Sequence, residues 1–228
     1  MSSPRSGQVD RALIGVGSLL FDFDGPLCDV FAGRSAPSVA RRLEGIVGRR
    51  FDTDDPLVIM YECRRIADSG LADRVEDLLI GEEVAAIESA RVNVAGVDAM
   101  LAGRDAGYRI AIVSNNSSDA VSRFLDVNNL VNVVGAVVGR HYRRPDLMKP
   151  NPWPLAHALE LIDGSPARAV LIGDAVTDVE ASKAAGVKCV ALANKAGKRE
   201  AFVRAAADAV IDDMAELGSA VRAVRGPG

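Results

Sequence analysis

Two aspartates follow an apolar run near the start of the chain, in the segment LLFDFDG at residues 19–25. The apolar run predicts a buried strand. Such a strand has no structural reason to end in acids, because burying an unpaired carboxylate is costly. Asp22 and Asp24 are two residues apart, so on a continuing strand they would face the same way. Gly25 allows a sharp turn and leaves room for a ligand. The pattern favours a nucleophile and a proton shuttle at the carboxyl edge of a sheet.

Three further polar motifs lie at, or just past, the ends of predicted strands. In an open α/β sheet the carboxyl ends of the strands are where ligands bind, so we expect these motifs to lie beside the first one. The motifs are Ser114-Asn115, Lys149-Pro150 and Gly173-Asp174-x₃-Asp178.

Four acids would then converge, namely Asp22, Asp24, Asp174 and Asp178. Four carboxylates in one cleft repel one another, and some would stay protonated unless a cation joined them. Mg²⁺ is a hard cation that prefers oxygen ligands, and it is usually held by one or two carboxylates and a substrate phosphate. The acids therefore indicate Mg²⁺ as a cofactor.

Lys149 adds a positive charge to this edge, and Ser114 and Asn115 add neutral hydrogen-bond donors. A cation, a lysine and donors around acids describe a phosphate site. Phosphate monoesters hydrolyse so slowly in water that several effects must combine to accelerate the reaction. A covalent aspartyl phosphate would split the reaction into two steps, and a second acid would protonate the leaving alkoxide and then activate water.

Apolar periodicity predicts alternating helices and short strands from residue 96 onward. This order predicts an α/β fold with a parallel sheet and helices on both faces. The segment 28–93 shows helical spacing and no convincing strand, which predicts an inserted all-α cap. The expected strands are residues 108–113, 136–138, 169–172, 188–192 and 209–211. The expected helices after the cap are residues 97–106, 118–128, 153–162, 178–185, 198–206 and 214–224.

The composition is that of a globular protein, with 228 residues, 49% hydrophobic residues and a net charge of −4. The negative charge argues against nucleic-acid and membrane-surface partners. The sequence has no apolar run of about 18 residues, as a transmembrane helix would require. The first ten residues are polar and lack the apolar centre of a signal peptide, so we expect a flexible tail there and a frayed end at 225–228. Three widely spaced cysteines, Cys28, Cys63 and Cys189, indicate reduced thiols and a cytoplasmic protein.

In order and spacing, the four motifs resemble those of the haloacid dehalogenase-like superfamily, and the resemblance covers roughly residues 19–211. The early helical segment is similar to the small α-helical cap of phosphoglycolate-phosphatase-like members. The resemblance implies a three-layer Rossmannoid core at residues 16–27 and 96–228. It also implies a cap at 28–95, and residues 1–15 before the core are then the expected flexible tail.

The resemblance also implies roles for the residues of the motifs. Asp22 would be the nucleophile and a metal ligand. Asp24 would be the general acid and base, with its backbone carbonyl on Mg²⁺. Asp174 would bind the metal directly, and Asp178 would support the metal shell. The transferring phosphoryl group would be held by Ser114, Asn115 and Lys149, of which Lys149 would also pair with Asp22.

These roles predict a Mg²⁺-dependent phosphatase that acts on a small phosphorylated metabolite through an aspartyl phosphate. A phosphomutase or phosphotransferase on the same fold is the first alternative, since only the phosphoryl acceptor differs. A dehalogenase is disfavoured because Asp24 and the acids near Asp174 serve phosphoryl and metal chemistry. A signalling receiver domain would carry its phosphorylated aspartate in mid-chain and lacks a cap. A catalytically inactive binding module is a third alternative, against which the intact charged residues argue.

For the other charged residues, the sequence pattern favours structural roles over catalytic or binding roles. The basic stretch Arg140, His141, Arg143 and Arg144 is typical of a solvated loop, although it could contact a substrate or partner. The cap arginines could reach an anionic substrate, but their spacing is more typical of exposed helix faces. These arginines are Arg41, Arg42, Arg64 and Arg65.

Overall fold

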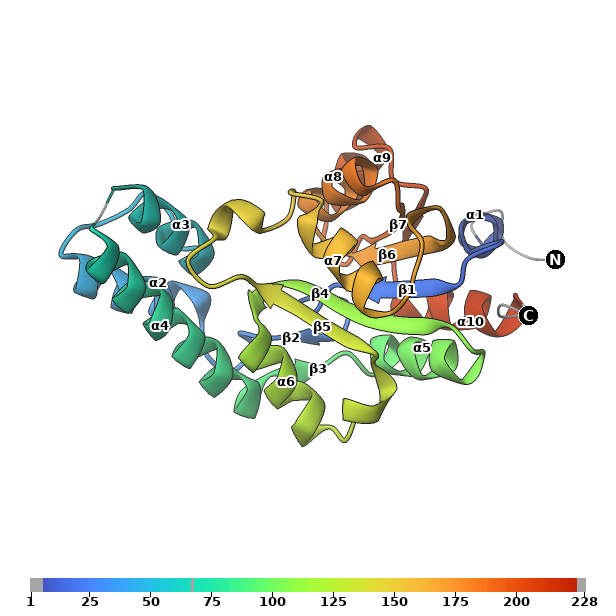
Figure 1. Cartoon of the computed structure of the whole chain (residues 1–228), viewed down its shortest axis with the longest axis horizontal. Coiled ribbons are helices and arrows are strands. Elements are labelled where there is room, and N and C mark those ends of the chain that lie inside the picture. Colours follow the sequence, from blue (N-terminus) through green and yellow to red (C-terminus); the bar gives the residue numbers. More distant parts are fainter. Residues whose placement is uncertain (1–5, 67, 225–228) are drawn as a thin grey trace.

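The computed structural model describes residues 6–66 and 68–224, and its centre is a six-stranded parallel sheet (Figure 1). The strand order is β5-β4-β1-β6-β7-β8, so the first strand lies inside the sheet and the chain crosses over on both sides of it. The strands are β1 (Ser18–Phe21), β4 (Arg109–Ser117), β5 (Ala136–Arg140), β6 (Ala169–Gly173), β7 (Lys188–Leu192) and β8 (Ala209–Ile211).

Helices cover both faces of this sheet, which confirms the predicted three-layer α/β core. Alternate side chains of β1 enter different apolar clusters, because successive residues of a strand point to opposite faces. Leu19 and Phe21 pack with α1, α5, α6 and α10, whereas Leu20 packs with α7 and α8. The helices are α1 (Ser6–Leu13), α5 (Val94–Asp105), α6 (Ser118–Val127), α7 (Trp153–Leu161), α8 (Val176–Ala185), α9 (Lys198–Arg204) and α10 (Met214–Ala223).

Three helices form a separate layer beyond one end of the sheet, namely α2 (Ala36–Val47), α3 (Pro56–Ile66) and α4 (Ser69–Ala86) (Figure 1). They share an apolar cluster of their own around Leu43, Ile59 and Leu79. This separate cluster supports our proposed division of the chain at residues 28–95. The predicted helical cap is thus present, and α4 runs back to pack against α6 of the core.

Two short strands, β2 (Cys28–Asp29) and β3 (Arg91–Val92), pair antiparallel where the cap joins the core. The prediction that the segment contains no strand was wrong at this point. A two-residue strand is too short to produce an alternating apolar pattern.

The predicted flexible tail at 1–15 was wrong for the residues that the structure describes. Ser6–Leu13 forms α1, with Val9 and Leu13 buried against α10 and β8. Val9, Ala12, Leu13 and Val16 have helical spacing, but the polar residues among them hid this apolar face. The rest of the two predicted mobile ends, 1–5 and 225–228, lies outside the described residues.

The sequence also predicted reduced cysteines and no transmembrane helix. Cys28, Cys63 and Cys189 are free and buried. Of the helices that the structure describes, none combines the length and apolar character needed to cross a membrane.

Candidate active site

The site is built where β1, β4 and β6 end side by side. Phe21, the last residue of β1, is in register with Ile112 of β4 and Ile172 of β6. The backbone N–H of Asp22 donates to the Ile172 carbonyl at 2.8 Å, which continues the ladder for one more residue. The Asp22 side chain therefore leaves the sheet at its carboxyl edge, as the sequence predicted.

Lys149 is buried between two carboxylates in this edge. Its Nζ lies 2.8 Å from Asp22 Oδ1 and 2.6 Å from Asp178 Oδ1, and it donates to the Val113 carbonyl at 3.1 Å. Burial acts to lower the pKa of Lys149, but the two carboxylates outweigh it and the pKa is raised. Burial also raises the pKa of Asp22, against the opposing effect of Lys149. The ammonium thus stays charged and compensates the buried acids.

Asp24 lies beside Asp22 in a half-buried position, and its Oδ1 accepts from the Val30 N–H at 3.0 Å. Burial raises the pKa of Asp24 to about 6. A carboxyl group with this pKa can both give and take a proton near neutral pH, which suits a general acid and base.

Gly25 makes the turn that brings the backbone past Asp174. Its φ is +106°, a value that L-residues with side chains rarely adopt. A Cβ atom here would lie 2.4 Å from the Asp174 Cγ. The glycine of the first motif is therefore required by the carboxylate of the last.

Three carboxylates can offer oxygens to one cation. Asp22, Asp174 and Asp178 each place a carboxylate oxygen within 4.8 Å of the others. These donors fit Mg²⁺, which prefers carboxylate oxygens. The Asp24 carboxylate is not in this group, and its predicted metal contact through the backbone carbonyl stays a prediction.

The sequence reasoning missed the partners of Asp174. Asp174 Oδ2 accepts from Lys198 Nζ at 2.6 Å and from Asn194 Nδ2 at 3.1 Å. Asp178 Oδ2 accepts from the Ala175 N–H at 2.9 Å at the start of α8. Asp178, rather than Asp174, thus stabilises the beginning of that helix.

Ser114 and Asn115 lie in the last part of β4 and line the same cavity as the acids. Ser114 Oγ accepts from the Asn116 N–H at 3.1 Å. The Asn115 amide is bound on both sides by Lys149, because Nδ2 donates to the Lys149 carbonyl and Oδ1 accepts from the Lys149 N–H. Asn115 therefore holds Lys149 in place, and its predicted contact with phosphate stays a prediction.

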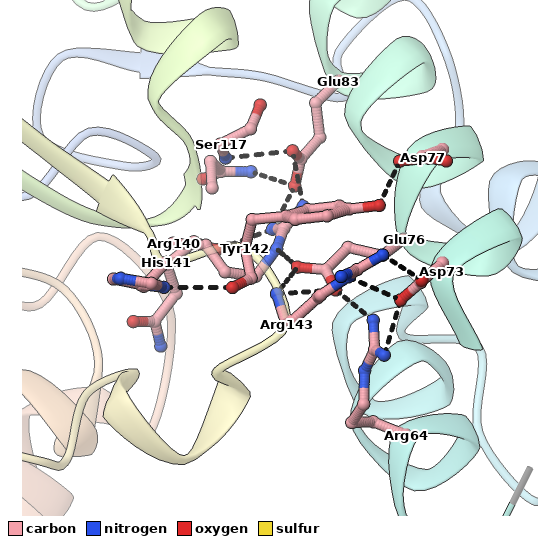
Figure 2. Close-up of polar contacts among 12 residues, drawn as sticks. Arg64, Asp73, Glu76, Asp77, Glu83, Ser117, Arg140, His141, Tyr142 and Arg143 are labelled. Carbon is pink, nitrogen blue, oxygen red and sulfur yellow. Dashed lines mark hydrogen bonds and ion pairs between the residues drawn. The ribbon is translucent and has the colours of Figure 1, made fainter. Parts of the chain in front are cut away.

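Arg140 is not in a solvated loop, and that prediction was wrong. Its side chain is 1% exposed and pairs with Glu83 of α4, which is 0% exposed. Arg140 Nη1 and Nη2 donate to the two Glu83 oxygens at 2.9 and 3.1 Å, and Nη1 also donates to the Asn115 carbonyl at 2.8 Å (Figure 2). Glu83 further accepts from the Ser117 N–H at 3.0 Å and from Asn116 Nδ2 at 3.2 Å. A cap helix thus holds the polar end of β4.

The loop after Arg140 extends this link between cap and core (Figure 2). The Arg143 N–H and guanidinium donate to Glu76 and Asp73 of α4, and the Tyr142 hydroxyl donates to Asp77 at 2.8 Å. His141, Arg143 and Arg144 are exposed, as the sequence predicted for this stretch.

The cavity around the acids has a volume of about 390 Å³ and lies between core and cap. The core contributes the motif residues described above, together with Met148 and Thr177. The cap contributes Asp55, Leu57, Val58 and Tyr61.

Comparison with known proteins points to the family that the sequence motifs resemble. The profile of the haloacid dehalogenase-like hydrolase family matches residues 80–192. A plasmid-encoded phosphoglycolate phosphatase of Cupriavidus necator is 30% identical over 82% of this chain and 73% of its own length. The phosphoglycolate phosphatase of Colwellia psychrerythraea is 27% identical over 76% of this chain and 83% of its own length.

Solved structures show the same fold. CbbY from Rhodobacter sphaeroides, solved in complex with phosphate, has a TM-score of 0.72 at 21% identity and covers 90% of this chain and 99% of its own. A predicted phosphatase from Clostridium acetobutylicum has a TM-score of 0.75 at 17% identity, with coverages of 92% and 99%. With the sheet, the cap and the acidic edge in place, the chain belongs to the haloacid dehalogenase-like hydrolases, and its homologues include phosphatases.

Proposed function

We propose that this protein is a Mg²⁺-dependent phosphatase that hydrolyses a small phosphorylated metabolite through an aspartyl phosphate on Asp22. The observation that carries the proposal is the buried Lys149 ammonium, 2.8 Å from Asp22 Oδ1, in a cavity that also contains Asp24. A nucleophile, a fixed cation and a carboxyl group able to exchange protons are the parts that such a reaction needs.

In the first step, an Asp22 oxygen forms a bond to phosphorus while the bond from phosphorus to the leaving oxygen breaks. Asp24 donates its proton to that oxygen, so the alcohol leaves neutral. In the second step, Asp24 takes a proton from water as the water oxygen attacks phosphorus. The bond to Asp22 breaks and inorganic phosphate leaves. Lys149 orients Asp22 and offsets charge on the phosphoryl oxygens.

The acids described above fit a divalent cation, and Asp22 and Asp174 would hold it, supported by Asp178 and the Asp24 carbonyl. When bound, Mg²⁺ supplies charge compensation for the phosphoryl oxygens. The residues of this chain do the rest: they bind, orient and transfer protons.

A phosphomutase or phosphotransferase on the same fold differs only in the group that accepts the phosphoryl from Asp22. Release of inorganic phosphate separates these functions. The inactive binding module is disfavoured by the ion pairs that hold Asp22, Lys149 and Asp178 together.

The proposal is tested by phosphate release from a panel of phosphorylated metabolites with Mg²⁺, including the phosphoglycolate named in the relatives. Activity should disappear in EDTA and return with Mg²⁺, whereas Ca²⁺ should support it poorly because its larger and looser shell misplaces the phosphoryl group. Asp22→Asn protein is the control for a contaminating phosphatase. Full turnover by metal-free protein, or by the Asp22→Asn variant, would contradict the proposal.

A further inference from the structure

The cap side of the cavity is largely apolar, and its polar groups are one carboxylate and the Tyr61 hydroxyl. Leu57, Val58 and Tyr61 of α3 line it, together with Asp55, whose Oδ1 accepts from the Leu57 N–H at 2.9 Å at the start of that helix. Among the described residues that line the cavity, Lys149 is the only cation, and it lies on the core side. The two ends of the cavity thus differ in kind, since one suits a phosphate and the other an apolar group.

Two arginines of the cap pair with carboxylates of the cap itself and do not face the cavity. Arg42 pairs with Glu82 of α4. Arg64 donates to Asp73 at 2.7 Å and to the buried Glu76 at 2.6 Å, as Figure 2 shows. Neither arginine lines the cavity. The cap therefore uses these cations to compensate its own acids.

The arginines of the loop before α3 also lie outside the cavity lining. Arg50 pairs with Glu44 at 2.7 Å, and the Arg49 guanidinium lies 4.8 Å from the centre of the Phe51 ring. Both side chains are exposed and neither lines the cavity.

A second cavity, of about 360 Å³, does contain cations, namely Lys195 and Arg91. It shares only Asp24 and Asp174 with the first cavity and is lined by neither Asp22 nor Lys149. Arg91 is also paired with Asp29 at 2.6 Å. These cations therefore do not compensate the cap wall that faces Asp22.

A substrate with a second anionic group would bind less favourably, because that group would lie against the cap side of the cavity. A carboxylate or phosphate held against Leu57 and Val58 would lose water without gaining a cationic partner, and the neutral Tyr61 hydroxyl would be the one donor on that wall. It would also be repelled by the Asp55 carboxylate. An apolar group of the same shape would gain from burial there.

We propose that the cap selects phosphate monoesters with an uncharged, partly apolar leaving group and discriminates against leaving groups that carry a second anion. This inference rests on the proposed phosphatase function, because it concerns the same site. It separates this chain from enzymes whose substrate has a carboxylate next to the phosphate ester.

A matched pair of esters tests the proposal. Isobutyl phosphate and phosphoglycolate have nearly the same shape, and differ in an isopropyl group against a carboxylate. With Mg²⁺, kcat/KM should be about tenfold or more higher for isobutyl phosphate. Equal values, or a preference for phosphoglycolate, would overturn the leaving-group proposal and leave the phosphatase function standing.

Binding separates the two proposals if neither ester is hydrolysed. Calorimetry with Mg²⁺ would compare 3-methylbutylphosphonate with 3-phosphonopropionate, in which a CH₂ group replaces the bridging oxygen of each ester. Absence of turnover on all esters would contradict the phosphatase function. Tighter binding of the methylbutyl compound would still support the cap selection, and tighter or equal binding of the carboxylate would overturn it.

Two variants test the wall itself. Val58 is 44% exposed, so Val58→Arg should fold, and it should raise kcat/KM for phosphoglycolate by about tenfold while lowering it for isobutyl phosphate. Ile66→Arg, on the same helix but outside the cavity lining, is its control. Asp55→Asn keeps the acceptor for Leu57 and should raise phosphoglycolate turnover severalfold. The same change at Asp54, which is exposed and does not line the cavity, is its control and should not. Variants that behave like their controls would overturn the proposal.

Discussion

At the scale of single residues, Lys149 shows how the site tolerates so much buried charge. An isolated buried carboxylate is costly, but Lys149 pairs with Asp22 and Asp178 at once. Asn115 supports this pairing, because its amide binds both the N–H and the carbonyl of Lys149. The residues that the sequence marked as catalytic are therefore also one another's structural support.

The raised pKa of Asp24 has a consequence for stability. Its pKa is about 6, against an ordinary value of 3.8. At a pH below the ordinary value the carboxyl is protonated in both the folded and unfolded states and costs nothing. As the pH rises toward the folded-state value, the unfolded state ionises first, so the folded state loses stability relative to it.

Asp24→Asn should therefore stabilise the metal-free protein. The amide keeps an acceptor for the Val30 N–H and carries no charge. We expect roughly 1 to 3 kcal/mol of added unfolding free energy at neutral pH, decreasing toward zero near pH 4. Urea unfolding in EDTA measures it, with the exposed Asp54→Asn as control. If the variant is less stable than the wild type at neutral pH, or if its added unfolding free energy persists in acid, then ionisation of the buried Asp24 does not destabilise the folded state.

Asp22, Asp24, Ser114 and Asp174 could be predicted from the sequence because they lie at, or just past, apolar runs that mark strands. Lys149 lies in a loop and Asp178 in α8, so these two were predicted from the order and spacing of the motifs. Arg140 and Glu83 could not, because they are 57 residues apart and neither lies in a local pattern that predicts burial. A basic stretch is usually solvated, and only the fold shows that one of its arginines meets a buried carboxylate.

At the scale of secondary structure, α4 connects the cap to the catalytic edge. Glu83 binds Arg140, Asn116 and the Ser117 N–H at the end of β4. The adjacent Glu82 also pairs with arginines, but these are Arg34 and Arg42 of the cap itself. Neighbouring glutamates of one helix thus serve different domains.

This pair of glutamates allows a matched test. Glu83→Gln should leave Arg140 buried with a weaker partner and cost about 3 kcal/mol of unfolding free energy. It should also lower kcat by a larger factor than it raises KM, because the end of β4, which we propose holds the phosphoryl group, would no longer be fixed in position. Glu82→Gln should affect stability but not kcat. Steady-state kinetics at a temperature where both variants are folded would decide, and equal kcat values for the two would contradict a positioning role for Glu83.

The strands of the core were located correctly because the centre of each is a short apolar run. The ends of β4 and β5 were not, since β4 continues past residue 113 to Ser117 and β5 past residue 138 to Arg140, where the sequence is polar. The prediction of β7 (Lys188–Leu192) and β8 (Ala209–Ile211) matches the structure residue for residue. The prediction failed where the apolar signal was diluted, as in α1, or too short, as in β2 and β3.

At the scale of the whole molecule, the acidic edge of the core, which we propose binds the phosphate, faces a largely apolar wall on the cap across one cavity. The parallel sheet and the helical cap could be predicted because local patterns report them. The pairing of cap with core could not, since it depends on ion pairs between residues far apart in the chain. We propose that in this arrangement the core residues carry out the chemistry and the cap selects the leaving group.

The covalent step through Asp22 is tested by rapid-quench mass spectrometry of the intact protein after mixing with p-nitrophenyl phosphate and Mg²⁺. Asp24→Asn should still transfer the phosphoryl group, because this leaving group needs little protonation, and should then stall for want of a base. That variant should accumulate one added phosphoryl group on Asp22, and Asp22→Asn should show none. A phosphoryl adduct on Asp22→Asn protein, or on any other residue of the wild type, would contradict the assignment of Asp22 as the nucleophile.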